Sequence, residues 1–127
     1  MNTKTLILLL MIFCHIVDDY YLQGVLAQMK QKRWWAENYP NPLYKYDYFV
    51  ALLIHGFSWA FMITLPLTIY TFVTGGKWYS FLFIVNMLMH FMVDDLKANG
   101  EKINLIEDQL LHITQIIATW ALWLYIL

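Results

Sequence analysis

Three pairs of histidine and aspartate recur in this sequence at a spacing of four residues, and one further histidine, His55, stands alone. The pairs are His15 with Asp19, His90 with Asp94, and Asp108 with His112. Residues four apart lie on one face of an α-helix, about 5–6 Å apart at their Cβ atoms, so each pair can direct two side chains at one point. Neutral imidazole combined with carboxylate suits Zn²⁺, Mn²⁺ or Fe²⁺. The spacing therefore favours a divalent metal site.

The segments that carry these pairs are long and apolar. Hydrophobic residues make up 61% of the 127-residue chain and charged residues 13%, whereas soluble domains carry about 25% charged residues. A membrane-spanning helix needs roughly 20 mostly apolar residues. We therefore expect an all-α fold, an integral membrane four-helix bundle that forms a single transmembrane domain over residues 1–127. Its helices are predicted at about 5–26, 49–73, 78–97 and 105–127.

Basic residues are unevenly shared between the two ends of the predicted bundle. Six lie in the connections 30–48 and 97–104, and two, Lys4 and Lys77, lie at the other end. Cytoplasmic connections carry an excess of Lys and Arg, which predicts an inner-membrane protein with these two connections in the cytoplasm and both termini outside. The 30–48 connection is also rich in Trp and Tyr, so we expect it to lie along the membrane interface.

All four histidines fall in the half of the bundle that adjoins the predicted cytoplasmic face. Ionisable residues inside apolar segments tend to mark function, and aspartates at one depth repel each other unless a cation neutralises them. Seven ligands exceed the three or four of a single zinc site, so one ion and two ions both stay open. Zinc is the first choice, with manganese or iron as alternatives. The predicted ligands are His15, Asp19, His55, His90, Asp94, Asp108 and His112.

Two further aspartates, Asp18 and Asp95, directly adjoin the paired ones in the sequence. One residue along an α-helix turns the side chain by about 100°, so these two carboxylates leave the face that the pairs share. We expect both to be solvated charges at the level of the lipid headgroups rather than ligands.

The order and spacing of these motifs resemble an uncharacterised family of small bacterial and phage-encoded membrane proteins, a domain of unknown function. The family pattern is HxxxD-aromatic-x-LQ in the first helix, a lone His in the second, HxxxDxxK in the third and DQxxH in the fourth. This chain matches the pattern at His15 to Gln23, His55, His90 to Lys97, and Asp108 to His112. Tyr20 stands where the family usually has Phe. The resemblance implies that Gln23, Lys97 and Gln109 belong to the site as substrate-binding residues.

The depth of the predicted site, near the phosphates of the lipid headgroups, suggests the substrate. We expect a metal-dependent hydrolase that acts on a lipid-linked or phosphorylated substrate, with a metal that activates water and polarises the scissile group. Catalytic roles are predicted for Asp19, Asp108 and Lys97: an aspartate acts as general base, and the lysine contacts the anionic substrate. The site is similar in style to those of membrane-bound metal-dependent hydrolases of bacterial inner membranes, which is an analogy only.

Two other functions stay open. Buried His and Asp could relay protons or bind a cation in transit, as in a proton- or cation-conducting transporter or channel subunit. The chain could instead be a non-enzymatic phage or bacterial membrane effector that holds a structural metal in a closed site. Membrane lipids are the expected partners and a homo-oligomer is left open. Nucleic acid is not expected, because 8 Lys and Arg against 9 Asp and Glu leave no basic surface.

Overall fold

The computed structural model describes residues 2–126, and every regular element in that range is helical. The prediction of an all-α fold is confirmed. A π-helical turn (Asp18–Leu22) continues the first helix, and a 3₁₀ turn (Pro42–Tyr44) precedes the longest one. The six α-helices within the described range are α1 (Thr3–Val17), α2 (Leu26–Met29), α3 (Lys32–Asn38), α4 (Asp47–Thr74), α5 (Ser80–Ala98) and α6 (Leu105–Ile126).

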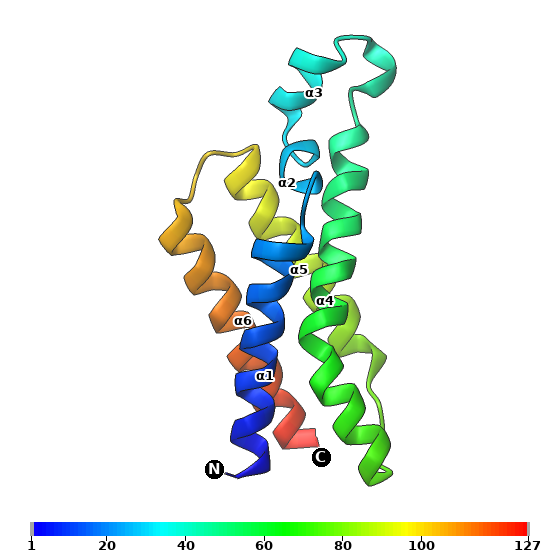
Figure 1. Ribbon diagram of the computed structural model, residues 1–127, viewed down its shortest axis with the longest axis vertical. Coiled ribbons are helices and arrows are strands. Elements are labelled where there is room, and N and C mark those ends of the chain that lie inside the picture. Colours follow the sequence, from blue (N-terminus) through cyan, green and yellow to red (C-terminus); the bar gives the residue numbers. More distant parts are fainter. Residues whose placement is uncertain (1, 127) are drawn as a thin grey trace.

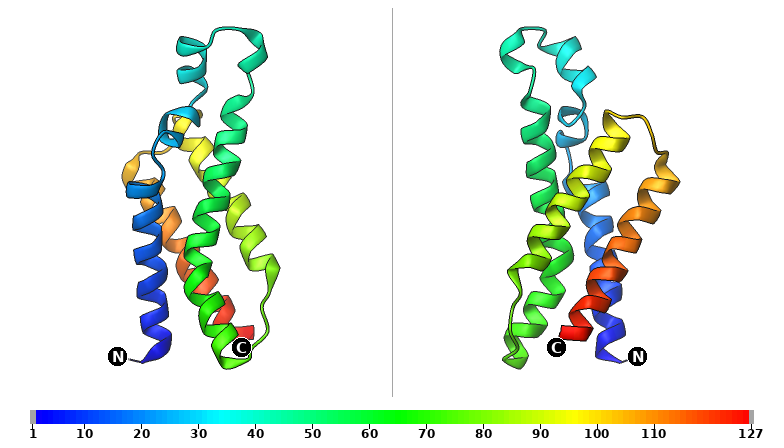
Figure 2. Two further views of the ribbon diagram at one scale, coloured as in Figure 1. Left: turned by 45° about the vertical axis from the view of Figure 1, so that its right-hand side comes forward. Right: turned by 180° about the vertical axis from the view of Figure 1, so that it is seen from behind.

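The four long helices run alternately up and down, so that both ends of the chain lie at the same end of the bundle (Figure 1). The short helices α2 and α3 lie at the opposite end, where α4 rises beyond the other long helices (Figure 2). We call residues 32–48, from α3 to the first residues of α4, the cap. At a rise of 1.5 Å per residue, the 28 residues of α4 extend for about 42 Å. This helix is therefore longer than the hydrocarbon layer of a bilayer, which is about 30 Å thick.

Within the described range, three helical segments are long and apolar enough to cross a membrane. They are Thr3–Leu22, Pro42–Thr74 and Leu105–Ile126. The fourth long helix, α5, is not among them, because Asp94, Asp95 and Lys97 interrupt its apolar run. The sequence predicts four spanning helices, and the fold supplies three candidate spans with α5 packed against α4.

The first long helix ends before the predicted boundary at residue 26. The α-helical hydrogen bonding gives way to a π-helical turn at Asp18, and the backbone leaves the helix after Leu22. Gly24 adopts a φ of 52°, in the left-handed region that favours glycine, and so turns the chain out of the helix. The turn directs the following residues, which include α2, back over the end of the bundle (Figure 1).

The apolar core occupies the half of the bundle nearer the chain ends. Trp59, which is fully buried, stands where this core meets a buried polar layer. Its indole stacks on the imidazole of His90, with ring centroids 4.2 Å apart. Large apolar side chains such as Phe13 and Phe72 also cover the outer faces of the helices. The bundle is therefore apolar outside as well as inside, as expected of helices that face lipid.

Close approach of α4 and α5 depends on a glycine. A Cβ atom built on Gly56 would lie 3.0 Å from the carbonyl oxygen of Met87 and 3.6 Å from the Cβ atom of Phe91. These contacts leave no room for a side chain between the two helices. The absence of a side chain here brings the neighbouring His55 within 3.0 Å of His90 across the helix interface.

Replacing Gly56 by leucine is expected to push α4 and α5 apart. Overpacking of this kind typically costs about 1–3 kcal/mol, so the melting temperature of the purified protein should fall. Ala118→Leu is the matched control, because it places the same side chain at an exposed position of α6. Equal thermal unfolding curves for the two variants would show that the close approach at Gly56 does not limit stability.

Candidate metal centre

A buried layer of histidines and aspartates crosses the bundle at one level, with contributions from all four long segments. The side chains of His15, His55, His90 and His112 are at most 1% exposed. Asp18, Asp94 and Asp108 are at most 3% exposed. Charged and polar groups in such an environment need partners or counter-ions, so the contacts within the layer decide what it can bind.

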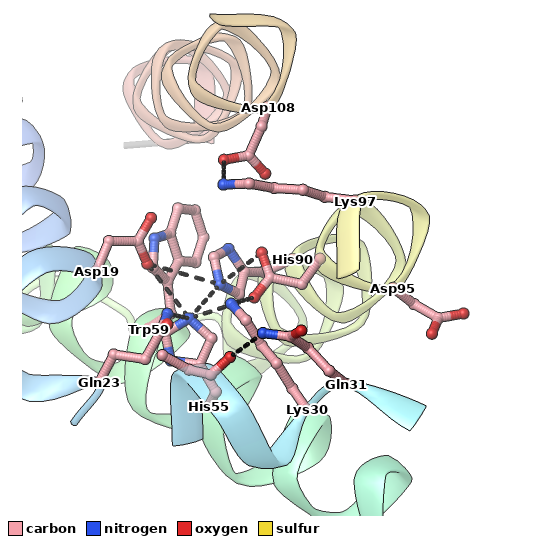
Figure 3. Close-up of polar contacts among 12 residues, drawn as sticks. Asp19, Gln23, Lys30, Gln31, His55, Trp59, His90, Asp95, Lys97 and Asp108 are labelled. Atoms are coloured by element: carbon pink, nitrogen blue, oxygen red, sulfur yellow. Dashed lines mark hydrogen bonds and ion pairs between the residues drawn. The ribbon is translucent and has the colours of Figure 1, made fainter. Parts of the chain in front are cut away.

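Asp19, His55 and His90 form a first cluster of ligand atoms (Figure 3). The Nε2 atoms of His55 and His90 lie 3.0 Å apart. A carboxylate oxygen of Asp19, Oδ1, lies 3.3 Å from the first of these nitrogens and 3.9 Å from the second. The side-chain amide nitrogen of Gln23 donates a hydrogen bond to Nε2 of His55 at 2.8 Å. Gln23, which the resemblance assigned to the site, therefore lies at its edge.

His90, Asp94 and His112 form a second cluster, which shares His90 with the first. Oδ1 of Asp94 lies 3.4 Å from Nε2 of His112 and 3.7 Å from Nε2 of His90. The Nδ1 atoms of the two histidines are 3.3 Å apart. Asp108 lies next to this cluster without belonging to it, with its Oδ1 atom 3.3 Å from Nε2 of His112. The two clusters are thus parts of one continuous site.

Several ligand atoms in this site have no hydrogen-bond donor. Among the described residues, Oδ1 of Asp19, Oδ1 of Asp108 and Nε2 of His112 are buried and lack a hydrogen-bond partner. Ligands bound about 2.1 Å from a shared tetrahedral zinc ion are about 3.4 Å from one another. The distances of 3.0–3.9 Å found in the clusters fall around that value. The residues present therefore fit a divalent cation.

The charges in the layer do not balance when the histidines are neutral. Lys30 donates from Nζ to Oδ2 of Asp94 at 2.6 Å, and Lys97 donates to Oδ2 of Asp108 at 2.6 Å. Four carboxylates thus meet two ammonium groups, which leaves an excess of two negative charges. The carboxylates are Asp18, Asp19, Asp94 and Asp108. One divalent cation would neutralise the layer, and an uncompensated charge inside a protein is strongly destabilising.

Lys30 is the member of the site that the spacing of the sequence does not single out. Lys30 is only 9% exposed, although the sequence places it in a basic connection between helices. Asn99, the C-cap residue of α5, holds the segment that contains Lys30 in place through two hydrogen bonds. Its amide nitrogen donates to the carbonyl of Lys30, and its amide oxygen accepts from the backbone N–H of Lys32. A lysine so close to a turn is typical of a loop, and only the fold reveals that it points inward.

His15 lies in the layer but outside both clusters. The indole N–H of Trp59 donates to Nδ1 of His15 at 2.8 Å, and Nε2 of His15 lies 3.1 Å from the amide oxygen of Gln109. Gln109 in turn donates to Oδ2 of Asp108 at 3.0 Å. Both nitrogens of His15 therefore have protein partners, and this residue orients Gln109 and, through it, Asp108.

Asp18 is buried, and the expectation that it is a solvated headgroup-level charge is wrong. It begins the π-helical turn, whose wider spacing brings adjacent side chains toward the interior, and such turns are frequent at functional sites. The hydroxyl of Ser58 donates to one of its oxygens, and the other lies 3.5 Å from Nδ1 of His55. Carboxylates placed behind a histidine in this way orient metal-binding imidazoles. Asp95, in contrast, points away from the cluster and accepts from Asn99 (Figure 3).

A small cavity of about 70 Å³ opens beside the layer at the end nearer the cap. Both lysines of the site and three of its carboxylates border it, so a small anion or a water molecule in the cavity would have charged and polar groups beside it. Its lining comprises Asp19, Tyr20, Gln23, Lys30, Asp94, Lys97, Leu105, Asp108 and Gln109.

Comparison with known sequences places the chain in a family. A family-wide sequence model described as a protein of unknown function, DUF3307, matches residues 6–126. The chain belongs to the DUF3307 family. No curated protein matches it, and no solved structure does. Membership of DUF3307 agrees with the resemblance to an uncharacterised family, and it assigns no activity to the buried site.

Asp18→Asn tests the orienting role of this carboxylate in the DUF3307 site. The variant keeps an oxygen for Ser58 but loses the charge that faces His55, so we expect metal affinity to fall about 10- to 100-fold. Competition with a chromogenic chelator measures the affinity. Asp95→Asn makes the same chemical change at a carboxylate outside the clusters and should leave affinity unchanged. If Asp18→Asn binds metal as tightly as the unaltered protein does, Asp18 has no orienting role.

Proposed function

We propose that this chain is a membrane protein that binds one divalent metal ion in its buried layer and hydrolyses a lipid-linked or phosphorylated substrate. One observation carries the proposal. The layer holds an excess of two negative charges, and several of its ligand atoms have no hydrogen-bond donor. A stable fold requires that this charge be compensated, and a divalent cation with His and Asp ligands does so directly.

The membrane setting is supported by the surface and by the three candidate spans. Six of the eight basic residues lie in residues 30–48 and 97–104, which favours a cytoplasmic location for that end in an inner membrane. Both termini would then lie on the outer side. In this orientation the buried layer lies close to the cytoplasmic headgroups, because Asp19 is near the end of its candidate span.

The proposed ligands are the members of the two clusters, namely Asp19, His55, His90, Asp94 and His112. A single ion is favoured over two, because His90 belongs to both clusters and one divalent charge balances the layer. Zinc suits this ligand set, with manganese or iron as alternatives. A cation here would replace the amide of Gln23 as the partner of His55. His15 and Asp18 then serve as supports for the ligands rather than as ligands.

The bound metal would act as a Lewis acid that activates water and polarises the phosphoryl group. Asp108 is the best-placed general base, because its Oδ1 atom lacks a donor and the residue lines the cavity. Its other oxygen is held by Lys97 and Gln109. In the proposed step, the water oxygen attacks phosphorus while Asp108 Oδ1 takes the water proton. The phosphoester P–O bond breaks, and the leaving oxygen takes a proton from Lys97.

The Asp108–Lys97 pair can return to its starting protonation state after each turnover. The carboxylate and ammonium groups are 2.6 Å apart, so the proton taken by Asp108 can pass to Lys97 and restore both groups. The Lys97 side chain is 35% exposed and can therefore also contact an anionic group that enters from outside. Lys30 borders the same cavity and adds a second positive charge for the substrate.

Metal analysis of the purified protein tests the first half of the proposal. We expect one divalent ion per chain by inductively coupled plasma mass spectrometry, and loss of that ion in His90→Gln. Removal by a chelator should lower the melting temperature, because metal at 100 times its dissociation constant stabilises a fold by about 2.7 kcal/mol. Asp95→Asn should retain the ion. Metal-free protein that unfolds at the same temperature before and after metal addition would exclude a metal centre.

Asp108→Asn tests the hydrolytic half. Because Asp108 lies outside the two clusters, the variant should keep its metal and lose at least about 100-fold in turnover, the usual contribution of a general base. The assay is release of inorganic phosphate from lipid phosphates in mixed micelles, with Glu107→Gln as the control on the same helix. Metal-loaded protein without turnover would instead favour a structural metal. Cation flux into proteoliposomes that His112→Ala abolishes would favour a transporter.

A further inference from the structure

A second feature of the molecule, the cap, contains a cavity of about 690 Å³. The cap lies at the end of the bundle opposite both termini (Figure 1), and the lining of its cavity includes no residue of the buried His and Asp layer. The walls are mainly aromatic rings and two lysines, and no acidic side chain lines it. The residues that matter here are Lys32, Trp35, Tyr39, Tyr44, Lys45 and Tyr48.

Packing among the rings gives the cap a defined shape. Trp35 is 9% exposed, and its indole N–H donates to the carbonyl of Met29 at 2.6 Å. Its ring stacks on Tyr44, and Tyr39 lies edge-on to Tyr44 with centroids 5.5 Å apart. Aromatic contacts of this kind are worth about 0.5–1.5 kcal/mol each beyond their buried area. These contacts between the rings therefore define the shape of the cavity.

The two lysines of the cavity lack acidic partners among the described residues. Nζ of Lys32 lies 4.8 Å from the centre of the Tyr48 ring, and Nζ of Lys45 lies 5.3 Å from the centre of the Tyr46 ring. Contacts with ring faces hold an ammonium group in place without neutralising it. The nearby Arg33, in contrast, is paired with Glu37, and neither of these residues lines the cavity. The cavity therefore offers positive charge to an anion.

The position of the cavity indicates where the anion comes from. Tyr44, Lys45 and Tyr48 belong to the candidate span Pro42–Thr74, so one wall of the cavity is the beginning of an apolar segment. Leu43 beside it is 75% exposed, and Val50, seven residues further along the chain, is 54% exposed. Tyr and Trp rings with lysines are typical of the headgroup level of a membrane, with apolar side chains for the lipid tails next to them.

We propose that the cap binds the headgroup of one anionic phospholipid, with Lys32 and Lys45 on the phosphate and the Tyr and Trp rings against a hydroxylated headgroup. The compact lysine ammonium groups suit a phosphate oxygen, and the tyrosine hydroxyls supply further hydrogen-bond donors. The exposed Leu43 and Val50 lie where the acyl chains of such a lipid would run. This site is independent of the proposed metal chemistry.

The experiment uses the full chain in detergent, exchanged with phosphatidylglycerol or phosphatidylcholine, and counts retained lipids by native mass spectrometry. We expect one tightly held phosphatidylglycerol per chain. Lys32→Gln combined with Lys45→Gln should reduce the preference for phosphatidylglycerol about 30-fold, since each lysine near an anionic surface contributes about a factor of five. Both residues are exposed, so the variant should keep its fold, and an unchanged melting temperature checks this.

Two controls separate a defined site from general electrostatic attraction. Arg33→Gln removes a charge from the cap outside the cavity, and Lys4→Gln combined with Lys77→Gln removes two charges at the opposite end. Both should retain the lipid. A loss in Arg33→Gln as large as that in the double cap variant, or retention by the double cap variant, would overturn the proposal. Displacement of the lipid by equimolar soluble glycerol phosphate would show that the occupant is not a membrane lipid.

Discussion

The fold depends on the neutralisation of carboxylates that lie together in one buried layer. Four aspartates with side chains at most 9% exposed meet in this layer, and their mutual repulsion opposes helix packing. Lys30 and Lys97 each compensate one of them through a short ion pair. The remaining two carboxylates, Asp18 and Asp19, face nitrogens of histidines on three helices, α1, α4 and α5. Whatever supplies the missing positive charge therefore also holds these helices together.

Local irregularities in the backbone bring the side chains of the layer into contact. The π-helical turn after α1 directs both Asp18 and Asp19 inward, which a regular α-helix would not do for adjacent residues. Gly56 lets α4 and α5 approach closely enough for His55 and His90 to touch. Trp59 stacks on His90 at the boundary between this layer and the apolar core. Backbone departures from ideal helices are thus concentrated where the polar groups meet.

Much of this arrangement could be predicted from the sequence, because helical periodicity fixes which side chains share a face. The HxxxD and DxxxH spacings placed Asp94, His90 and His112 together, and the lone His55 joins them. Periodicity fails where the helix is irregular or where a contact is distant. The burial of Asp18 follows from a π-helical turn that the spacing of the residues does not predict. Lys30 pairs with Asp94, which lies 64 residues later in the sequence. The indole partner of His15 likewise depends on packing between helices.

The separation of Lys30 from Asp94 has a consequence for how the chain is made. Synthesis proceeds from the N-terminus, so α1 emerges with Asp18 and Asp19 before α5 exists. Gln109, which contacts His15, follows 94 residues after it. Asp18 and Asp19 can contact Ser58 and His55 once α4 has been made, whereas the Gln109 contact of His15 forms only after α6 has left the ribosome. Assembly of the layer is thus a late event in biosynthesis, and a chain truncated before α6 would lack the Gln109 contact and the Lys97–Asp108 pair.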